Sequence, residues 1–163
     1  MTTARVVEVR LLELPTSVHE RAQAHGAGLS REFRLLREQV RADGEGSDDD
    51  VPARLLDLMA VLGERYTDAT QEQDDLIWGA RERGQQTVPQ VVYRVPSDVA
   101  GAATALLALL DEADDFCRTG EHLLTVVSSA EVRRYRHWYL MEFVRQIGGA
   151  DPVPWSAYQG EGG

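Results

Sequence analysis

The chain has 163 residues, of which 43% are hydrophobic and 27% charged, and its formal net charge is −10. These values are typical of a single globular domain that buries its own core. The excess of 27 acidic over 17 basic residues argues against nucleic acid as a partner, because phosphate binding requires a basic face. It also argues against a membrane partner, and the sequence has no apolar run of the roughly 18 residues that cross a bilayer.

The cysteine count and the first residues indicate the compartment. Cys117 is the only cysteine, so the chain cannot form an internal disulfide, which favours a reducing environment. Residues 1–15 lack the apolar stretch and the small-residue cleavage site of a secretory signal. We therefore expect the protein to be cytoplasmic.

The N-terminal part predicts a strand followed by a helix. Residues 5–14 alternate between apolar and polar side chains, as in a half-buried strand. Pro15 ends the strand and Thr16 offers a hydroxyl to cap a helix. Apolar side chains then recur every three or four positions from Val18 to Val40, which predicts a helix of about six turns.

The next part predicts a loop and two helices. Residues 41–52 are polar and rich in glycine and aspartate, as loops are. An apolar series that ends at Tyr66 predicts one helix. Thr70 and Gln73 have the spacing of a capping box, which predicts a separate helix that ends at Gly84.

The remaining part predicts two strands and two helices. Residues 87–96 and 122–127 are rich in β-branched side chains, which indicates strands. Residues 98–118 are apolar around much of the helical circumference, which predicts a helix buried against more than one neighbour. Ser128 and Ser129 are expected to cap the last helix, which extends to residue 147.

Together these elements predict an α+β fold, with a small, mostly parallel three-stranded sheet covered by about five helices. The parallel direction follows from the strand–helix–strand passage between residues 87 and 127, which favours a right-handed crossover. We assign residues 1–150 to one domain. Residues 151–163 are expected to form an extended, flexible tail, because Pro152 and Pro154 prevent a helix there.

Common catalytic motifs are absent from the sequence. The chain has no lysine, so it has no phosphate-binding loop of the Gly-x-x-x-x-Gly-Lys type, and it has no Gly-x-Ser-x-Gly elbow. No histidine has another histidine four positions away, or a glutamate three positions before it, as metal ligands on one helical face often do. We therefore predict that the chain binds no metal or cofactor and is not an enzyme.

Arg136 is a predicted structural ion-pair residue. It falls in the middle of the apolar stripe of the last helix, where an unpaired charge would be very costly to bury. The acidic segment DEADD, residues 111–115, offers carboxylates to it. The predicted partners are Asp111, Asp114 and Asp115.

A second seam runs along the last helix, opposite the apolar stripe. It consists of Arg134, Trp138, Met141 and Arg145, which follow steps of four, three and four residues. Tryptophan, methionine and arginine are enriched at protein interfaces. The seam is therefore a candidate face for a protein partner or for self-association. Two alternatives remain open: the tail covers it through Trp155 or Tyr158, or a small molecule binds there.

The segment from residue 95 to 155 resembles a group of actinobacterial regulatory proteins. The phrases LDEADDFC, GEHLLTV and RHWYLMEFVRQI carry this resemblance. Proteins of that group accompany anti-sigma-factor kinases and anti-sigma-factor antagonists in partner-switching systems. The kinases of such systems have asparagine boxes for ATP, and this chain contains no asparagine. The resemblance therefore implies a non-catalytic regulatory role, with an anti-sigma factor or its antagonist as partner.

Two functions follow as expectations. The first is a non-catalytic cytoplasmic module that binds a protein partner, in partner-switching control of transcription. The second is a small-molecule sensor or an enzyme with a pocket between the sheet and the helices. That pocket would use Arg136, His137 or His122.

Overall fold

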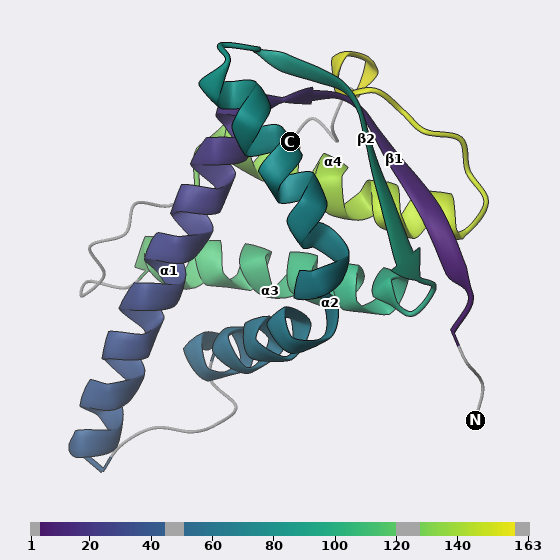
Figure 1. The fold of residues 1–163 in the computed structure, drawn as a ribbon. Helices are drawn as coiled ribbons and strands as arrows, with labels where there is room; N and C mark the ends of the chain where they lie inside the picture. The colour runs from purple at the N-terminus through teal and green to yellow at the C-terminus, as the bar shows by residue number, and fades with distance from the viewer. Residues whose placement is uncertain (1–3, 45–50, 120–127, 159–163) are drawn as a thin grey trace.

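A computed structural model describes residues 4–44, 51–119 and 128–158 of the chain. Two strands, four α-helices and one 3-10 turn make up these residues (Figure 1). In chain order they are β1 (Val6–Pro15), α1 (Thr16–Ala42), α2 (Val51–Glu82), β2 (Thr87–Pro96), α3 (Val99–Thr119), α4 (Ala130–Ile147) and η1 (Trp155–Ala157). None of the helices in these parts of the chain is long and apolar enough to cross a membrane.

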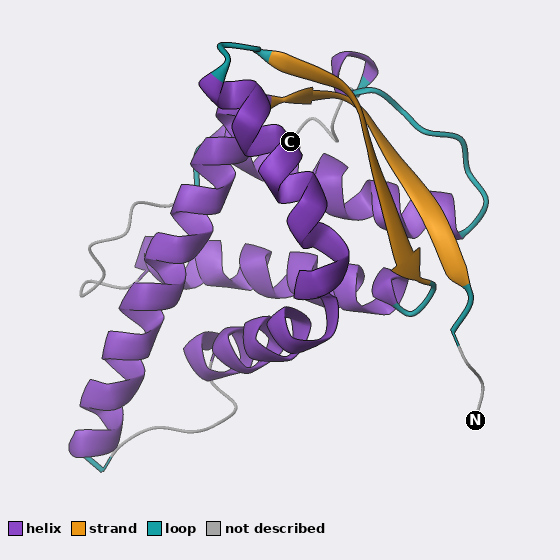
Figure 2. Ribbon diagram, in the orientation of Figure 1, coloured by secondary structure: helices purple, strands orange, loops and turns teal. Residues whose placement is uncertain are grey.

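The sheet is antiparallel and, in the described residues, consists of β1 and β2 alone. The pairing extends from Val6 opposite Pro96 to Pro15 opposite Thr87. The fold is thus α+β, but the predicted parallel three-stranded sheet is wrong. The physical reason is the connection: α1 and α2 lead the chain away from the sheet and back again, so β2 enters beside the end of β1 and runs opposite to it (Figure 2). The strand predicted at residues 122–127 lies outside the described residues.

The prediction of five helices is also wrong for the described residues, because the two helices predicted on either side of Thr70 are one helix, α2. The Thr70 hydroxyl does not cap a helix start but bonds back to the Tyr66 carbonyl at 3.2 Å, and Thr67 bonds in the same way to Gly63. Such bonds are compatible with a continuous helix and often bend it. Figure 1 shows that α2 changes direction along its length.

One face of the sheet belongs to the core and the other faces water. Val9 and Leu11 are completely buried, whereas Glu8 and Arg10, which precede each of them in the strand, are exposed. This is the alternation that the sequence predicts. The alternation shifts at Glu13, which has a φ of 57°. After this bend Leu14 again points inward, so the end of the strand continues to cover the core.

The core has two clusters. The larger one lies between the sheet and α4, and the start of α1 and the end of α2 also contribute to it. Its aromatic members are Tyr93, Tyr135, Trp138 and Phe143. The smaller one lies where α1, α2 and α3 meet, and is formed by Leu29, Phe33, Leu55, Leu109 and Ala113.

Two glutamine side chains form hydrogen bonds with the backbone at the two edges of the sheet, at the same position along the strands. The Gln146 amide of α4 accepts a hydrogen bond from the Arg10 N–H and donates one to the Arg10 carbonyl, both at 2.8 Å. On the other edge, Nε2 of Gln73 in α2 donates to the Val92 carbonyl at 2.8 Å. Arg10 and Val92 are opposite each other in the register. Each glutamine therefore replaces part of a missing neighbouring strand at the same pair.

Candidate functional site

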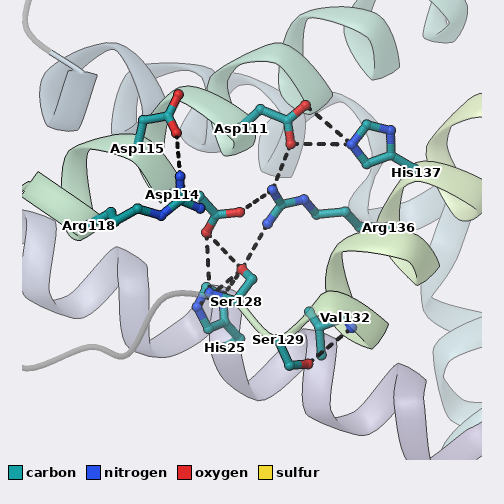
Figure 3. Close-up of polar contacts among 10 residues, drawn as sticks. All are labelled: His25, Asp111, Asp114, Asp115, Arg118, Ser128, Ser129, Val132, Arg136 and His137. Atoms are coloured by element: carbon teal, nitrogen blue, oxygen red, sulfur yellow. Dashed lines mark hydrogen bonds and ion pairs between the residues drawn. The ribbon is translucent and has the colours of Figure 1, made fainter. Parts of the chain in front are cut away.

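Arg136 lies at the centre of a buried polar cluster between α3 and α4 (Figure 3). Only 7% of the residue is exposed. Its Nη2 donates to Asp111 Oδ1 at 2.8 Å and to Asp114 Oδ2 at 2.5 Å. Its Nη1 donates to the Ser128 hydroxyl at 2.9 Å.

Asp114 is the most enclosed carboxylate of this cluster. Its second oxygen accepts hydrogen bonds from the Ser128 hydroxyl at 2.9 Å and the Ser128 amide at 3.3 Å. Burial alone would raise the pKa of Asp114, but the hydrogen bonds and charge of Arg136, with the Ser128 bonds, lower it below its usual value. Asp115, the third predicted partner of Arg136, forms an exposed ion pair with Arg118 at 3.1 Å.

This cluster is built to hold helices together. Asp111 also lies 3.2 Å from Nε2 of His137, and the ring of His25 from α1 lies 3.3 Å from the Ser128 hydroxyl. Both terminal nitrogens of Arg136 and both oxygens of Asp114 bond to one another, to Asp111 or to Ser128, and only Nε of Arg136 is buried without a partner among the described residues. Among the described residues the arrangement therefore fixes α4 against α3, rather than presenting a free acid or base to a substrate.

The Arg136→Ala substitution should lower the free energy of unfolding by about 3–5 kcal/mol, because it leaves Asp114 charged and buried without its partner. Replacing both residues, as Arg136→Met with Asp114→Leu, should restore most of that loss, since no uncompensated charge then remains. Urea titrations of the two variants measure both effects. A loss below about 1 kcal/mol for Arg136→Ala would show that the pair is not effectively buried.

The Trp138 seam is covered by the chain's own C-terminal segment. Trp138 has no exposed surface, and its Nε1 donates to the Val153 carbonyl at 2.8 Å. Its ring centroid lies 5.5 Å from that of Trp155 in a T-shaped arrangement. The guanidinium of Arg134 lies 5.0 Å over the Trp155 ring and donates to the Tyr158 carbonyl at 2.9 Å.

The other seam residues contribute to the same cover. Arg145 forms an ion pair with the buried Glu142 and donates to the Asp151 carbonyl at 3.2 Å, while Met141 is half-buried. The seam in this structure is thus an internal contact, the first of the two alternatives left open by the sequence. Residues 151–154 are without helix or strand, and Trp155–Ala157 form η1 rather than the extended chain that was predicted. The segment is held on α4, because Trp155 packs on the buried Trp138 and the Val153 carbonyl accepts its Nε1–H.

The Trp138→Ala substitution should therefore destabilise the domain by about 3–5 kcal/mol, as loss of a core tryptophan does. A Trp155→Ala variant should keep the fold and make Trp138 accessible, which acrylamide quenching of indole fluorescence measures. An unchanged melting temperature for Trp138→Ala would contradict the internal role of this residue.

A groove of about 580 Å³ between α1 and α2 was not predicted from the sequence. It lies where the first turns of α1 approach the last turns of α2. The lining residues are Thr16, His19, Glu20, Gln23, Ala24, Ala27, Asp74, Asp75, Ile77, Trp78 and Arg81.

His19 lines the inner wall of this groove. Its Nδ1 lies 2.5 Å from the hydroxyl of the buried Tyr135, and Gln23 lies beside its Nε2 at 3.4 Å. Only 7% of His19 is exposed. This burial lowers the pKa of His19 to about 4, so the ring is neutral at pH 7.

The outer wall carries an exposed tryptophan, Trp78, and two carboxylates, Asp74 and Asp75, that form no ion pair with any described residue. Trp78 is 57% exposed, and its Nε1 donates to Glu82 at 3.0 Å. Burial and the neighbouring charge of Asp75 raise the pKa of Asp74. The sequence held one signal for this wall: Asp74, Asp75 and Trp78 have the three- and four-residue spacing that places side chains on one helical face.

The low pKa of His19 makes stability depend on pH. The unfolded chain takes up this proton near pH 6.5 and the folded chain only near pH 4, so stability falls as the pH decreases between these values, by about 3 kcal/mol. A His19→Gln variant, which can still bond Tyr135, should lose this part of the dependence. Urea midpoints of both proteins at pH 7 and pH 4.5 test it. Parallel pH curves for the two would contradict the assignment.

In the described part of the chain, no three histidine, cysteine or acidic side chains are grouped so that they could hold a metal ion. Comparison of the chain with protein-family models, with curated proteins and with solved structures gave no match. The residues themselves therefore carry the functional argument.

Proposed function

We propose that this chain is a non-catalytic regulatory module that binds a protein partner in the groove between α1 and α2. The observation that carries the proposal is the 57% exposure of Trp78 at the groove wall. Tryptophan is costly to leave in water and is the residue type most enriched among binding hot spots. This face takes the place of the seam around Trp138, which the chain's own tail covers.

The form of the groove supports a protein segment as ligand. Ala24 and Ala27 of α1, which are small and exposed, line the groove together with Ile77 and Trp78 of α2. Two helices with small residues on one wall and a large aromatic on the other can receive the apolar ridge of a third helix.

The narrower proposal concerns partner switching. The phrases LDEADDFC and RHWYLMEFVRQI support a partner among anti-sigma factors and their antagonists, in cytoplasmic control of transcription. The alternative is a small-molecule sensor or an enzyme. One observation favours this alternative: the groove is lined by His19, a buried and neutral imidazole that lies beside the hydroxyl of Tyr135.

A Trp78→Ala variant should keep the fold, with less than about 1 kcal/mol of destabilisation, because most of the side chain is exposed. It should weaken partner binding by about 2 kcal/mol or more. Affinity capture from the native cell with both proteins as bait, followed by titration of the recovered partner, measures the difference. The control is Leu35→Ala, which removes a side chain that is 61% exposed on α1 and does not line the groove.

Equal capture of the partner by wild type and Trp78→Ala would contradict the groove as the binding face. Retention of a small metabolite that the Trp78→Ala variant loses, without any protein, would favour the sensor over the protein-binding module.

A further inference from the structure

The groove between α1 and α2 carries net negative charge. Arg81 lies on its wall, but its guanidinium bonds to Glu20 on the opposite helix at 2.5 Å, so these two charges cancel. His19 is neutral at pH 7. Asp74 and Asp75 are then the charged lining residues left without an ion pair among the described residues.

The two carboxylates share one side of α2 with the exposed indole of Trp78. Asp74 and Asp75 are one turn before Trp78 on α2, so the three side chains share one side of the helix. The Nε1–H of this indole donates to the carboxylate of Glu82, one turn further along the helix, at 3.0 Å. An aromatic ring next to carboxylates is an environment that binds cations, because both the ring face and the carboxylates attract positive charge.

We infer that the groove takes an amphipathic helix of a partner protein that places an arginine side chain between the Trp78 ring and the carboxylates of Asp74 and Asp75. This inference rests on the proposed docking function and names the chemistry of the partner. A guanidinium fits this site for three reasons. It stacks on an indole, its planar fork binds a carboxylate with two hydrogen bonds, and it remains charged when it is partly desolvated.

The charge of the groove also explains which partners it rejects. An acidic helix would bring like charges toward Asp74 and Asp75, and Arg81, the arginine that lines the groove, already bonds to Glu20. Burial, together with the repulsion from the neighbouring carboxylate of Asp75, raises the pKa of Asp74. A bound arginine relieves this repulsion, so its arrival should lower the pKa of Asp74 again.

The test uses the full chain and Nα-acetyl-arginine amide as the probe, with Nα-acetyl-citrulline amide as its neutral analogue. Nuclear magnetic resonance follows the indole Nε1–H signal of Trp78, assigned with a Trp78→Phe variant. The arginine probe should shift this signal with a dissociation constant in the millimolar range, and the citrulline probe should shift it at least about tenfold less. High salt should weaken the response, since the contact is electrostatic.

Matched variants separate local from overall charge. Asp74→Asn with Asp75→Asn should abolish the response to the arginine probe. Glu64→Gln with Asp68→Asn changes the net charge equally on exposed positions of the same helix, outside the groove lining, and should keep the response. No response to the arginine probe, an equal response to citrulline, or a response that survives loss of both groove carboxylates would each overturn the inference.

The same variants separate this inference from the proposed function. Partner capture that is lost with Trp78→Ala but kept with Asp74→Asn and Asp75→Asn would leave the groove as the binding face and refute only the arginine. Capture that Trp78→Ala leaves unchanged would refute the binding face itself.

Discussion

The fold depends on helix α4, which provides the apolar surface and the edge hydrogen bonds that a two-stranded sheet lacks. Two strands alone bury too little apolar surface to be stable in water, and each has an open edge. Tyr135 and Phe143 of α4 fill the space under the sheet, while Gln146 bonds both backbone groups of Arg10 at its edge. One helix thus provides both the second layer of the core and part of a missing strand.

The consequence is that α4 is enclosed on nearly every side, and its polar residues must find partners inside the protein. Arg136 finds them in α3, through Asp111 and Asp114. Glu142, which is 2% exposed, accepts from Arg145, from the Gln146 amide at 2.8 Å and from the Val153 amide at 3.1 Å. A buried charge is tolerated when several donors surround it.

These bonds connect the C-terminal segment to the sheet. Val153 bonds to Glu142, Glu142 to Gln146, and Gln146 to Arg10 of β1. The hydroxyl of Ser156 adds a second connection, to the carboxylate of Glu13 at the bend of β1. Residues 151–158 therefore belong to the fold, although their two prolines suggested a loose tail. Loss of the segment would uncover Trp138 and also leave Glu142 without one of its donors.

The sequence predicted what depends on local pattern and missed what depends on contacts between distant residues. Both described strands and the placement of Arg136 beside Asp111 and Asp114 followed from periodicity and from the cost of an unpaired buried charge. The direction of β2 did not, because it depends on how α1 and α2 return the chain to the sheet. Thr70 was predicted to cap a helix because a threonine hydroxyl can either cap a helix start or bond to the carbonyl four residues earlier within a helix. It does the second here, because residue 66 already belongs to the same helix.

Trp138 and Trp78 show the same limit for the candidate site. Each lies on a helix near carboxylates or arginines, so the sequence gives each the composition of a binding face. Their difference lies in the segment that covers them: residues 153–158 pack on Trp138, whereas Trp78 is 57% exposed. The charged residues around the two tryptophans also differ. Near Trp138, Arg134 and Arg145 bond to the covering segment. Near Trp78, Asp74 and Asp75 form no ion pair with a described residue. The polar groups around Trp138 thus have hydrogen-bond partners within the chain. The face around Trp78 keeps exposed apolar surface and unpaired negative charge, so a bound partner can lower the free energy most there.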